Sequence, residues 1–254
     1  MSTALPGSAA AISLRLVRVP AACQACTVKH RAICQVLSPE DRHVLGRIGR
    51  VQSLPRGATL MWEGDATTSV ANVLEGVLKL SRSTADGREQ ILGVAYPSDF
   101  VGRPFGRRVP YQVTAVTDAR LCLFPRAAFE RFAAEHPELE HELLERTLID
   151  LERAHGQLLD LGRKTAAERL ASFLLDLSHR LAQAQCTAGD GTQAPLDGLE
   201  LPLSRQQIGD LLGLVIETVS RTLHRMQDAG AIELVGRRGL LIRDRAMLRR
   251  LAGG

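Results

Sequence analysis

Short apolar runs divided by glycines fill the chain between residues 51 and 125. Runs of this length and spacing are typical of strands in an antiparallel sandwich or a barrel-like roll. Asp86-Gly87 stands between two such runs and favours a hairpin, because this dipeptide readily adopts the backbone angles of a tight turn. The pattern predicts strands at residues 59–62, 72–74, 77–81, 90–94, 112–115 and 119–124.

Helical periodicity replaces this pattern on both sides of the β region. Ser38 is followed by Pro39 and two acidic residues, which is a typical helix start. Three further helices are expected at residues 126–135, 137–164 and 165–184.

The longest of these helices carries a heptad stripe. Its apolar positions recur at alternating intervals of four and three, at Leu144, Leu148, Leu151, His155 and Leu158. Such a stripe either faces the protein's own core or forms a parallel seam with a second copy. The spacing keeps a strict heptad and does not drift at 3.6, which favours the seam and therefore a homodimer.

The C-terminal part has the pattern of a winged helix-turn-helix. Ser204 and Gln207 form a capping box that opens a short helix, and a turn at 213–215 leads into a second helix at 216–226. Two strand-like runs at 232–235 and 240–242 then form a wing. The apolar positions of the second helix that are expected to pack inward are Ile216, Val219, Leu223 and Met226.

The opposite face of that second helix has the chemistry of a DNA major-groove reader. Arg221 can bond both acceptors of guanine, Glu217 can accept from cytosine, and Ser220 is permissive. As an alternative, Glu217 and Arg221 could be an exposed i,i+4 pair of little consequence. The wing favours DNA, and the residues expected to contact its backbone are Ser204, Arg205, Arg237 and Arg238.

Composition narrows the class of protein. The 254 residues suffice for one or two domains, and the 45% hydrophobic fraction is ordinary for a globular chain. No apolar run approaches about 18 residues, and the N-terminal arginines follow the first apolar run, unlike in a signal peptide. We therefore expect a cytoplasmic protein without membrane contact. No Ser-His-Asp set, phosphate loop or carboxylate pair stands out, so no enzyme is expected.

Three of the five cysteines, Cys23, Cys26 and Cys34, lie within twelve residues. This density indicates metal or redox chemistry. With His30 they match a compact zinc site. A [4Fe-4S] cluster instead needs four thiolates, and the fourth would have to be Cys122 in a strand-like run, whose position alone suggests a core cysteine. Cys186 lies in a Gly/Pro loop and is expected to be a bystander.

Several of these strings together resemble one family. LPRGATLMWEGD, the hairpin around Asp86-Gly87, the long helix and IETVSRTL are similar to the cyclic-AMP receptor protein superfamily. The N-terminal cysteines, LCLFPR and the E-x-x-S-R pattern resemble its FNR branch, the fumarate and nitrate reduction regulators. The resemblance implies an α+β fold with a cysteine arm at 1–36, a β-roll sensor domain at 37–136, a dimerisation helix at 137–164 and a winged helix-turn-helix at 165–254.

The resemblance also implies a function. An oxygen-labile [4Fe-4S] cluster on Cys23, Cys26, Cys34 and Cys122 would promote a homodimer. That dimer would bind a TTGAT-like inverted repeat through Glu217, Ser220 and Arg221 and act with RNA polymerase. Zinc or thiol-redox control is the alternative. Cyclic-nucleotide control is disfavoured, because the stretch 101–111 lacks the Gly-Glu and Arg-Ser pairs of nucleotide-binding members.

Overall fold

The computed structural model describes residues 23, 25–185 and 194–253. The arm over residues 1–22 and the loop position Cys186 lie outside the described residues. The described part begins with the cysteine segment (residues 23–36), which ends in the 3-10 helix η1 (Ile33–Val36) and leads into helix α2 (Pro39–Ile48). Ser38 caps α2 as its sequence predicts, since its hydroxyl accepts from the Asp41 backbone amide at 3.1 Å.

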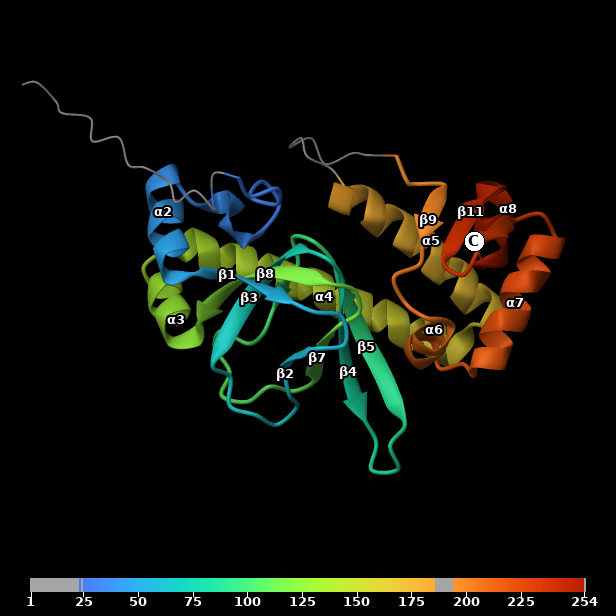
Figure 1. Cartoon of the computed structure of the whole chain (residues 1–254), viewed down its shortest axis with the longest axis horizontal. Coiled ribbons are helices and arrows are strands. Elements are labelled where there is room, and N and C mark those ends of the chain that lie inside the picture. Colours follow the sequence, from blue (N-terminus) through green and yellow to red (C-terminus); the bar gives the residue numbers. More distant parts are fainter. Residues whose placement is uncertain (1–22, 24, 186–193, 254) are drawn as a thin grey trace, which may run out of the picture.

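A roll of two four-stranded antiparallel sheets follows (Figure 1). One sheet has the order β1-β8-β3-β6 and the other β2-β7-β4-β5. Apolar side chains such as Val73, Leu78 and Leu121 fill the space between them. The strands are β1 (Arg50–Leu54), β2 (Thr59–Met61), β3 (Ser69–Glu75), β4 (Leu78–Ser83), β5 (Glu89–Ala95), β6 (Phe100–Val101), β7 (Gln112–Ala115) and β8 (Ala119–Pro125).

The six predicted strands are present, and two more were not predicted. β1 was not predicted because most of its residues are polar or exposed, and Leu54 is its only buried residue. β6 has two residues and owes its form to pairing with β3. β1 is mostly polar and β6 is too short to show an alternating pattern, so both depend on the completed sheet.

Three helices connect the roll to the C-terminal unit. They are α3 (Arg126–Ala134), α4 (Pro137–Arg163) and α5 (Ala166–Gln185), close to their predicted bounds. Leu139 and Leu143 of α4 join Ile33 of the cysteine segment and Phe124 of β8 in one apolar cluster. This cluster holds the cysteine segment, the roll and the first half of α4 against one another.

The C-terminal unit is a winged helix-turn-helix. Its elements are β9 (Gly198–Glu200), α6 (Arg205–Leu212), α7 (Ile216–Asp228), β10 (Ile232–Val235), β11 (Gly239–Ile242) and α8 (Arg245–Leu251). The predicted capping box of Ser204 and Gln207 is present. Gly213 ends α6 at φ 65°, a left-handed conformation that glycine adopts without strain. The two-stranded wing gains β9 as a third strand.

For one residue of α7, the prediction that its side chain packs inward was wrong. Ile216 is 37% exposed, whereas Val219, Leu223 and Met226 are buried as predicted. Ile216 is the first residue of α7 and stands where the chain leaves the turn, before the helix reaches the core.

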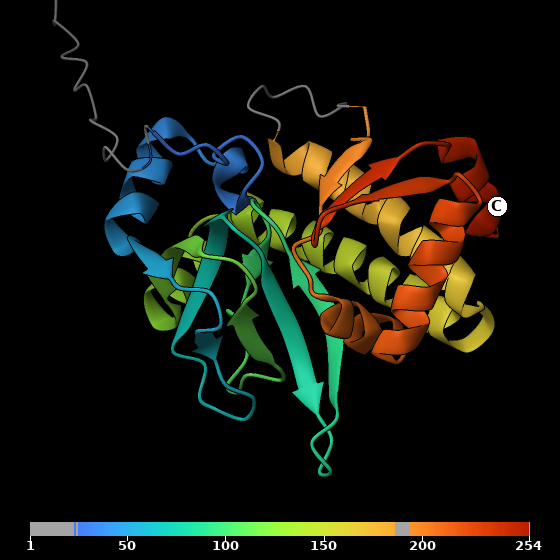
Figure 2. The same ribbon diagram turned by 45° about the vertical axis from the view of Figure 1, so that its right-hand side comes forward.

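The unit rests against the roll beside the β4–β5 hairpin (Figure 2). Gln90 of β5 and Gln157 of α4 both donate to the Leu211 carbonyl, at 3.3 Å each. The antiparallel sheets together with the helices confirm the predicted α+β fold class. In the described ranges, no helix combines the length and apolarity needed to cross a membrane.

Candidate metal centre and nucleic-acid interface

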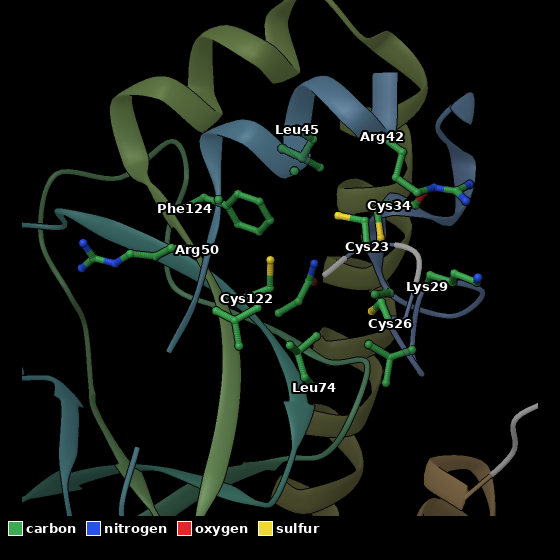
Figure 3. Close-up of a pocket in the computed structure, with 16 residues that line it drawn as sticks. Cys23, Cys26, Lys29, Cys34, Arg42, Leu45, Arg50, Leu74, Cys122 and Phe124 are labelled. Carbon is green, nitrogen blue, oxygen red and sulfur yellow. The ribbon is translucent and has the colours of Figure 1, made fainter. Parts of the chain in front are cut away.

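Four cysteines from two distant parts of the chain line one pocket (Figure 3). Cys23, Cys26 and Cys34 belong to the cysteine segment, and Cys122 comes from β8. In Figure 3 the Cys122 side chain points from the sheet toward the segment that carries the other three. All four are partly buried free thiols.

Alternation along β8 aims Cys122 at this pocket. Its neighbours Leu121 and Leu123 are 0% and 7% exposed and pack into the roll. Because side chains alternate along a strand, Cys122 must face outward, toward the cysteine segment. Ile33, the first residue of η1, and Leu37, which directly follows it, are both buried and anchor Cys34 opposite Cys122.

No three of the four described cysteine sulfurs all lie within 4.8 Å of one another. Among the described residues, the one group of three or more His, Cys, Asp or Glu side chains whose ligand atoms all lie within 4.8 Å is Asp41, His136 and Glu138. Tetrahedral zinc with four ligands at about 2.3 Å would bring its sulfurs to about 3.8 Å of one another. The group Cys23, Cys26, His30 and Cys34 is not gathered in this way.

Burial and mutual repulsion act on the thiols. Burial, followed by the charge of Cys26, raises the pKa of Cys34 to about 11, while the nearby Arg42 guanidinium works in the opposite direction. Burial, followed by the charges of the other three cysteines, raises the pKa of Cys122 to about 12. Burial therefore favours the neutral thiol at Cys34 and at Cys122, and a thiolate at either position would need a bound positive centre.

Cationic side chains border the same pocket. Arg42 is fixed there because its guanidinium donates to the carbonyls of Cys34 at 3.3 Å and Leu37 at 2.9 Å. Lys29 and Arg50 also line the pocket. The surroundings therefore suit a group that carries net negative charge once thiolates hold it.

Sequence reasoning missed two residues of this pocket. Asn72 is 2% exposed, lines the pocket, and its Oδ1 has no hydrogen-bond partner. A buried polar atom left unpaired costs about 1–3 kcal/mol. The signal that could have found it is a lone amide within the apolar string Val70-Ala-Asn-Val-Leu74.

Gly49 is the second missed residue. A Cβ added there would lie 2.6 Å from Cε1 of Phe124 and 3.4 Å from Sγ of Cys122. Only glycine lets the chain pass this close to the buried ring, so Gly49 keeps the wall of the pocket open beside Cys122.

The second helix of the helix-turn-helix presents the expected face to solvent. Glu217 and Arg221 are exposed and Ser220 is half-buried, opposite the buried Val219 and Leu223. Arg225 continues this face one turn further and is also exposed, and the sequence reasoning did not single it out. The arrangement matches a helix that offers polar side chains to base edges.

The four residues expected to contact the DNA backbone differ in their surroundings. Arg237 is exposed at the tip of the wing, whereas Arg238 turns back and donates to the Pro202 carbonyl at 3.2 Å. The Ser204 hydroxyl is engaged as the cap of α6. Arg205 is half-buried, its Nη1 has no partner, and burial lowers the pKa of its guanidinium.

The heptad stripe of α4 lies on the surface of the single chain. Its leucines at 144, 148, 151 and 158 are 55%, 51%, 49% and 66% exposed, and His155 is exposed as well. The alternative in which the stripe faces the chain's own core is therefore wrong. Apolar stripes of this extent usually mark an interaction surface.

Comparison with known proteins agrees with this architecture. A Crp-like helix-turn-helix domain matches residues 168–251 and a cyclic nucleotide-binding domain matches residues 51–136. Transcriptional activator protein FnrL of Cereibacter sphaeroides is 39% identical over 231 residues, which cover 91% of this chain and 92% of that protein. Transcriptional activator protein Anr of Pseudomonas aeruginosa is 32% identical over 235 residues, covering 91% and 93%.

A solved structure supports the same relation. FixK2 from Bradyrhizobium japonicum superposes with a TM-score of 0.72 at 30% identity, over 80% of this chain and 97% of that chain. Members of this group regulate transcription and are not enzymes. The chain therefore belongs to the CRP/FNR family of transcriptional regulators, with a β-roll domain joined to a DNA-binding helix-turn-helix.

Proposed function

We propose that this protein is an oxygen-responsive transcriptional activator. A [4Fe-4S] cluster on Cys23, Cys26, Cys34 and Cys122 would promote dimerisation and binding to a TTGAT-like inverted repeat when oxygen is low. The observation that carries the proposal is the meeting of four cysteines, from two segments far apart in sequence, at one pocket. The names of the relatives FnrL and Anr, both transcriptional activators, support the regulatory class.

The residues present fit such a cluster better than a single zinc ion. Four sulfur donors are the usual ligand set, and a cubane spreads its thiolates over separate irons. That spread suits ligand atoms that are not gathered within 4.8 Å. The cationic Arg42 beside Cys34 suits the negative charge of a cluster held by four thiolates. When bound, the cluster supplies a group that oxygen can convert or remove.

Hydrogen bonds connect the cysteine segment to the proposed dimer helix. Arg146 of α4 pairs with Glu142 at 2.6 Å, and its guanidinium also donates to the carbonyls of Arg31 and of Ser98, the latter at 3.0 Å. Gln35 of the segment donates to the same Glu142 carboxylate at 2.9 Å. Glu142 is 7% exposed, so this network is held largely away from water.

The network and the stripe occupy opposite sides of α4. Successive residues lie about 100° apart around a helix, which places Glu142 and Arg146 opposite the stripe of Leu144, Leu148 and Leu151. A shift of the cysteine segment would therefore move the support of the helix and, with it, the surface that meets a second copy. This is how the chain would couple the state of the cysteines to dimerisation.

The dimer would then set the DNA-binding geometry. A two-fold axis places two copies of α7 about one DNA turn apart, which matches an inverted repeat. Glu217, Ser220 and Arg221 would read bases, and Arg237 would contact phosphate. The remaining parts of the proposal are a cytoplasmic location and contact with RNA polymerase. A cyclic nucleotide is not part of the proposal, because the stretch 101–111 lacks the Gly-Glu and Arg-Ser pairs of nucleotide-binding members.

The metal content of single variants tests the proposal. In the cluster arrangement, His30→Ala retains iron because all ligands are sulfur, and Cys122→Ser loses it because three thiolates hold a cluster poorly. Iron and zinc are measured after anaerobic purification, with Cys186→Ser as the matched cysteine control. Zinc in the wild type that disappears in His30→Ala and persists in Cys122→Ser would refute the cluster.

A further inference from the structure

Asn72 is a buried amide within the apolar middle of β3. Its neighbours Val70, Ala71 and Val73 are each 0% exposed and belong to the clusters on the two faces of the sheet. Asn72 itself is 2% exposed, and its Oδ1 is unpaired. Buried polar groups in proteins nearly always have a partner, so an unpaired one calls for an explanation.

The sheet register places this amide beside Cys122. Asn72 of β3 lies directly opposite Cys122 of β8 in the antiparallel pairing. Side chains of such a pair stand on the same face, with Cβ atoms about 4.5–5.5 Å apart. Asn72 therefore lines the same pocket as the four cysteines.

The chemistry of the pocket suggests what the amide binds. A carboxamide carries two N–H donors and one carbonyl acceptor, and which end faces a given partner follows from the partner. Thiolates and the sulfides of a cluster accept hydrogen bonds, and bonds of this kind set the stability and potential of iron–sulfur centres. A neutral thiol, by contrast, is only a weak hydrogen-bond partner.

We propose that Asn72 is a positioning residue of the cysteine site, whose amide N–H donates to a sulfur of the bound cluster or of the Cys122 thiolate. The inference rests on the proposed cluster. It goes beyond the four ligands, because it assigns a fifth side chain that holds the site without binding iron. Partners of this outer kind typically change metal affinity by about 10–100-fold when removed.

The test compares Asn72→Leu with a matched control, Thr67→Val. Thr67 is also buried, at 6% exposure, and its Oγ1 is also unpaired, but it does not line the cysteine pocket. Two quantities are measured: the thermal midpoint of the metal-free protein and the time for the visible cluster absorption to bleach in air. Wild-type loading with iron is established first, so that failure of the proposed function is seen before any variant is compared.

Both substitutions should leave the metal-free midpoint equal or higher, because each removes an unpaired buried polar atom. Asn72→Leu should shorten the bleaching time about tenfold, and Thr67→Val should leave it unchanged. A lower midpoint for metal-free Asn72→Leu would mean that the amide serves the fold alone and would overturn the inference. An unchanged bleaching time in Asn72→Leu would overturn it as well.

A second pair of variants separates the effect of the hydrogen bond from the effect of side-chain size. Asn72→Ser and Asn72→Ala leave similar cavities, but only serine keeps a hydrogen-bond donor. The serine variant should keep its cluster several-fold longer in air, while the two metal-free proteins melt alike. Equal cluster lifetimes in this pair would contradict a hydrogen bond from residue 72.

Discussion

In the proposed DNA complex, some exposed side chains would read bases and others would contact the phosphate backbone. Arg221 is exposed on the outward face of α7, where a guanidinium can bond both acceptors of a guanine. Arg237 is exposed at the wing tip, where phosphate is the nearer partner. The two arginines should therefore differ in the kind of binding they support.

Arg221→Ala should cost about 1–3 kcal/mol per half-site and relax preference at one base pair. Arg237→Ala should weaken binding to all sequences alike and flatten the salt dependence, because it removes a phosphate contact. The measurement is a titration against a TTGAT inverted repeat and its single-base variants at two salt concentrations. Uniform loss from Arg221→Ala, with altered base preference from Arg237→Ala, would show that the wrong element faces the groove.

The sequence alone singled out the four cysteines that line one pocket and the exposed face of α7, but not Asn72 or Gly49. Cys23, Cys26 and Cys34 stand out because they lie close together in the sequence. Cys122 stands out because it lies in LCLFPR, a motif that resembles the family. The importance of Asn72 depends on burial and on a register of strands, and that of Gly49 on a buried ring 2.6 Å from its missing Cβ. Tertiary contacts of this kind leave no local periodicity.

Among the helices and strands, capped helices and strands bounded by glycines were predictable, whereas β1 and β6 were not. Ser204 and Ser38 fix helix starts through bonds to amides three residues on, which a sequence displays directly. β1 and β6 form because a neighbouring strand is present, which a sequence does not display. The contacts between elements therefore offer the more informative experiments.

The junction of α2 with α3 and α4 should depend on pH. Both ring nitrogens of His136 are engaged, Nδ1 with the Phe132 carbonyl at 2.6 Å and Nε2 with the Asp41 carboxylate at 3.3 Å. Burial opposes the charge on the ring, but these bonds outweigh it and raise the pKa of His136 above its ordinary 6.5. Hydrogen bonds from Ser38 and His136 lower the pKa of Asp41 below 3.8.

The pair therefore stabilises the fold between about pH 4 and 6.5, by about 0.2–1 kcal/mol for a partly exposed contact. The contribution of His136 is lost as pH rises through its raised pKa, and that of Asp41 as pH falls through its lowered pKa. Thermal melts of wild type and His136→Gln should differ more at pH 5 than at pH 8.5. A larger difference at pH 8.5 would reverse the assigned sign.

The link between the cysteine segment and α4 makes a separate prediction. Arg146→Gln removes the bonds to Arg31 and Ser98, whereas Arg153→Gln removes only a surface pair with Asp150 at 3.1 Å on the same helix. The cluster should load in both variants. In Arg146→Gln, however, the ratio of dimer dissociation constants without and with the cluster should fall toward one. Sedimentation measures that ratio, and a wild-type ratio in Arg146→Gln would place the coupling elsewhere.

At the scale of the whole molecule, the exposed stripe on α4 should bring two chains together. Leu151 is 49% exposed in the single chain, so Leu151→Asp should fold. In a dimer it would place two like charges in an apolar seam, which should weaken dimerisation by about a hundredfold or more. Ile149→Asp adds the same charge off the heptad, at a residue 46% exposed, and is the matched control. Equal dimerisation of the two variants would refute the seam.

In the proposed function, one air-sensitive cluster governs DNA binding. This proposal is tested most directly by titrating a TTGAT inverted repeat with anaerobically purified protein, then repeating the titration on the same sample after exposure to air. The visible absorption of the cluster is followed throughout. We expect the absorption to bleach and the affinity for DNA to fall at the same time, the affinity by about 5- to 150-fold. A colourless anaerobic protein, or an affinity that air leaves unchanged while the colour fades, would contradict the proposal.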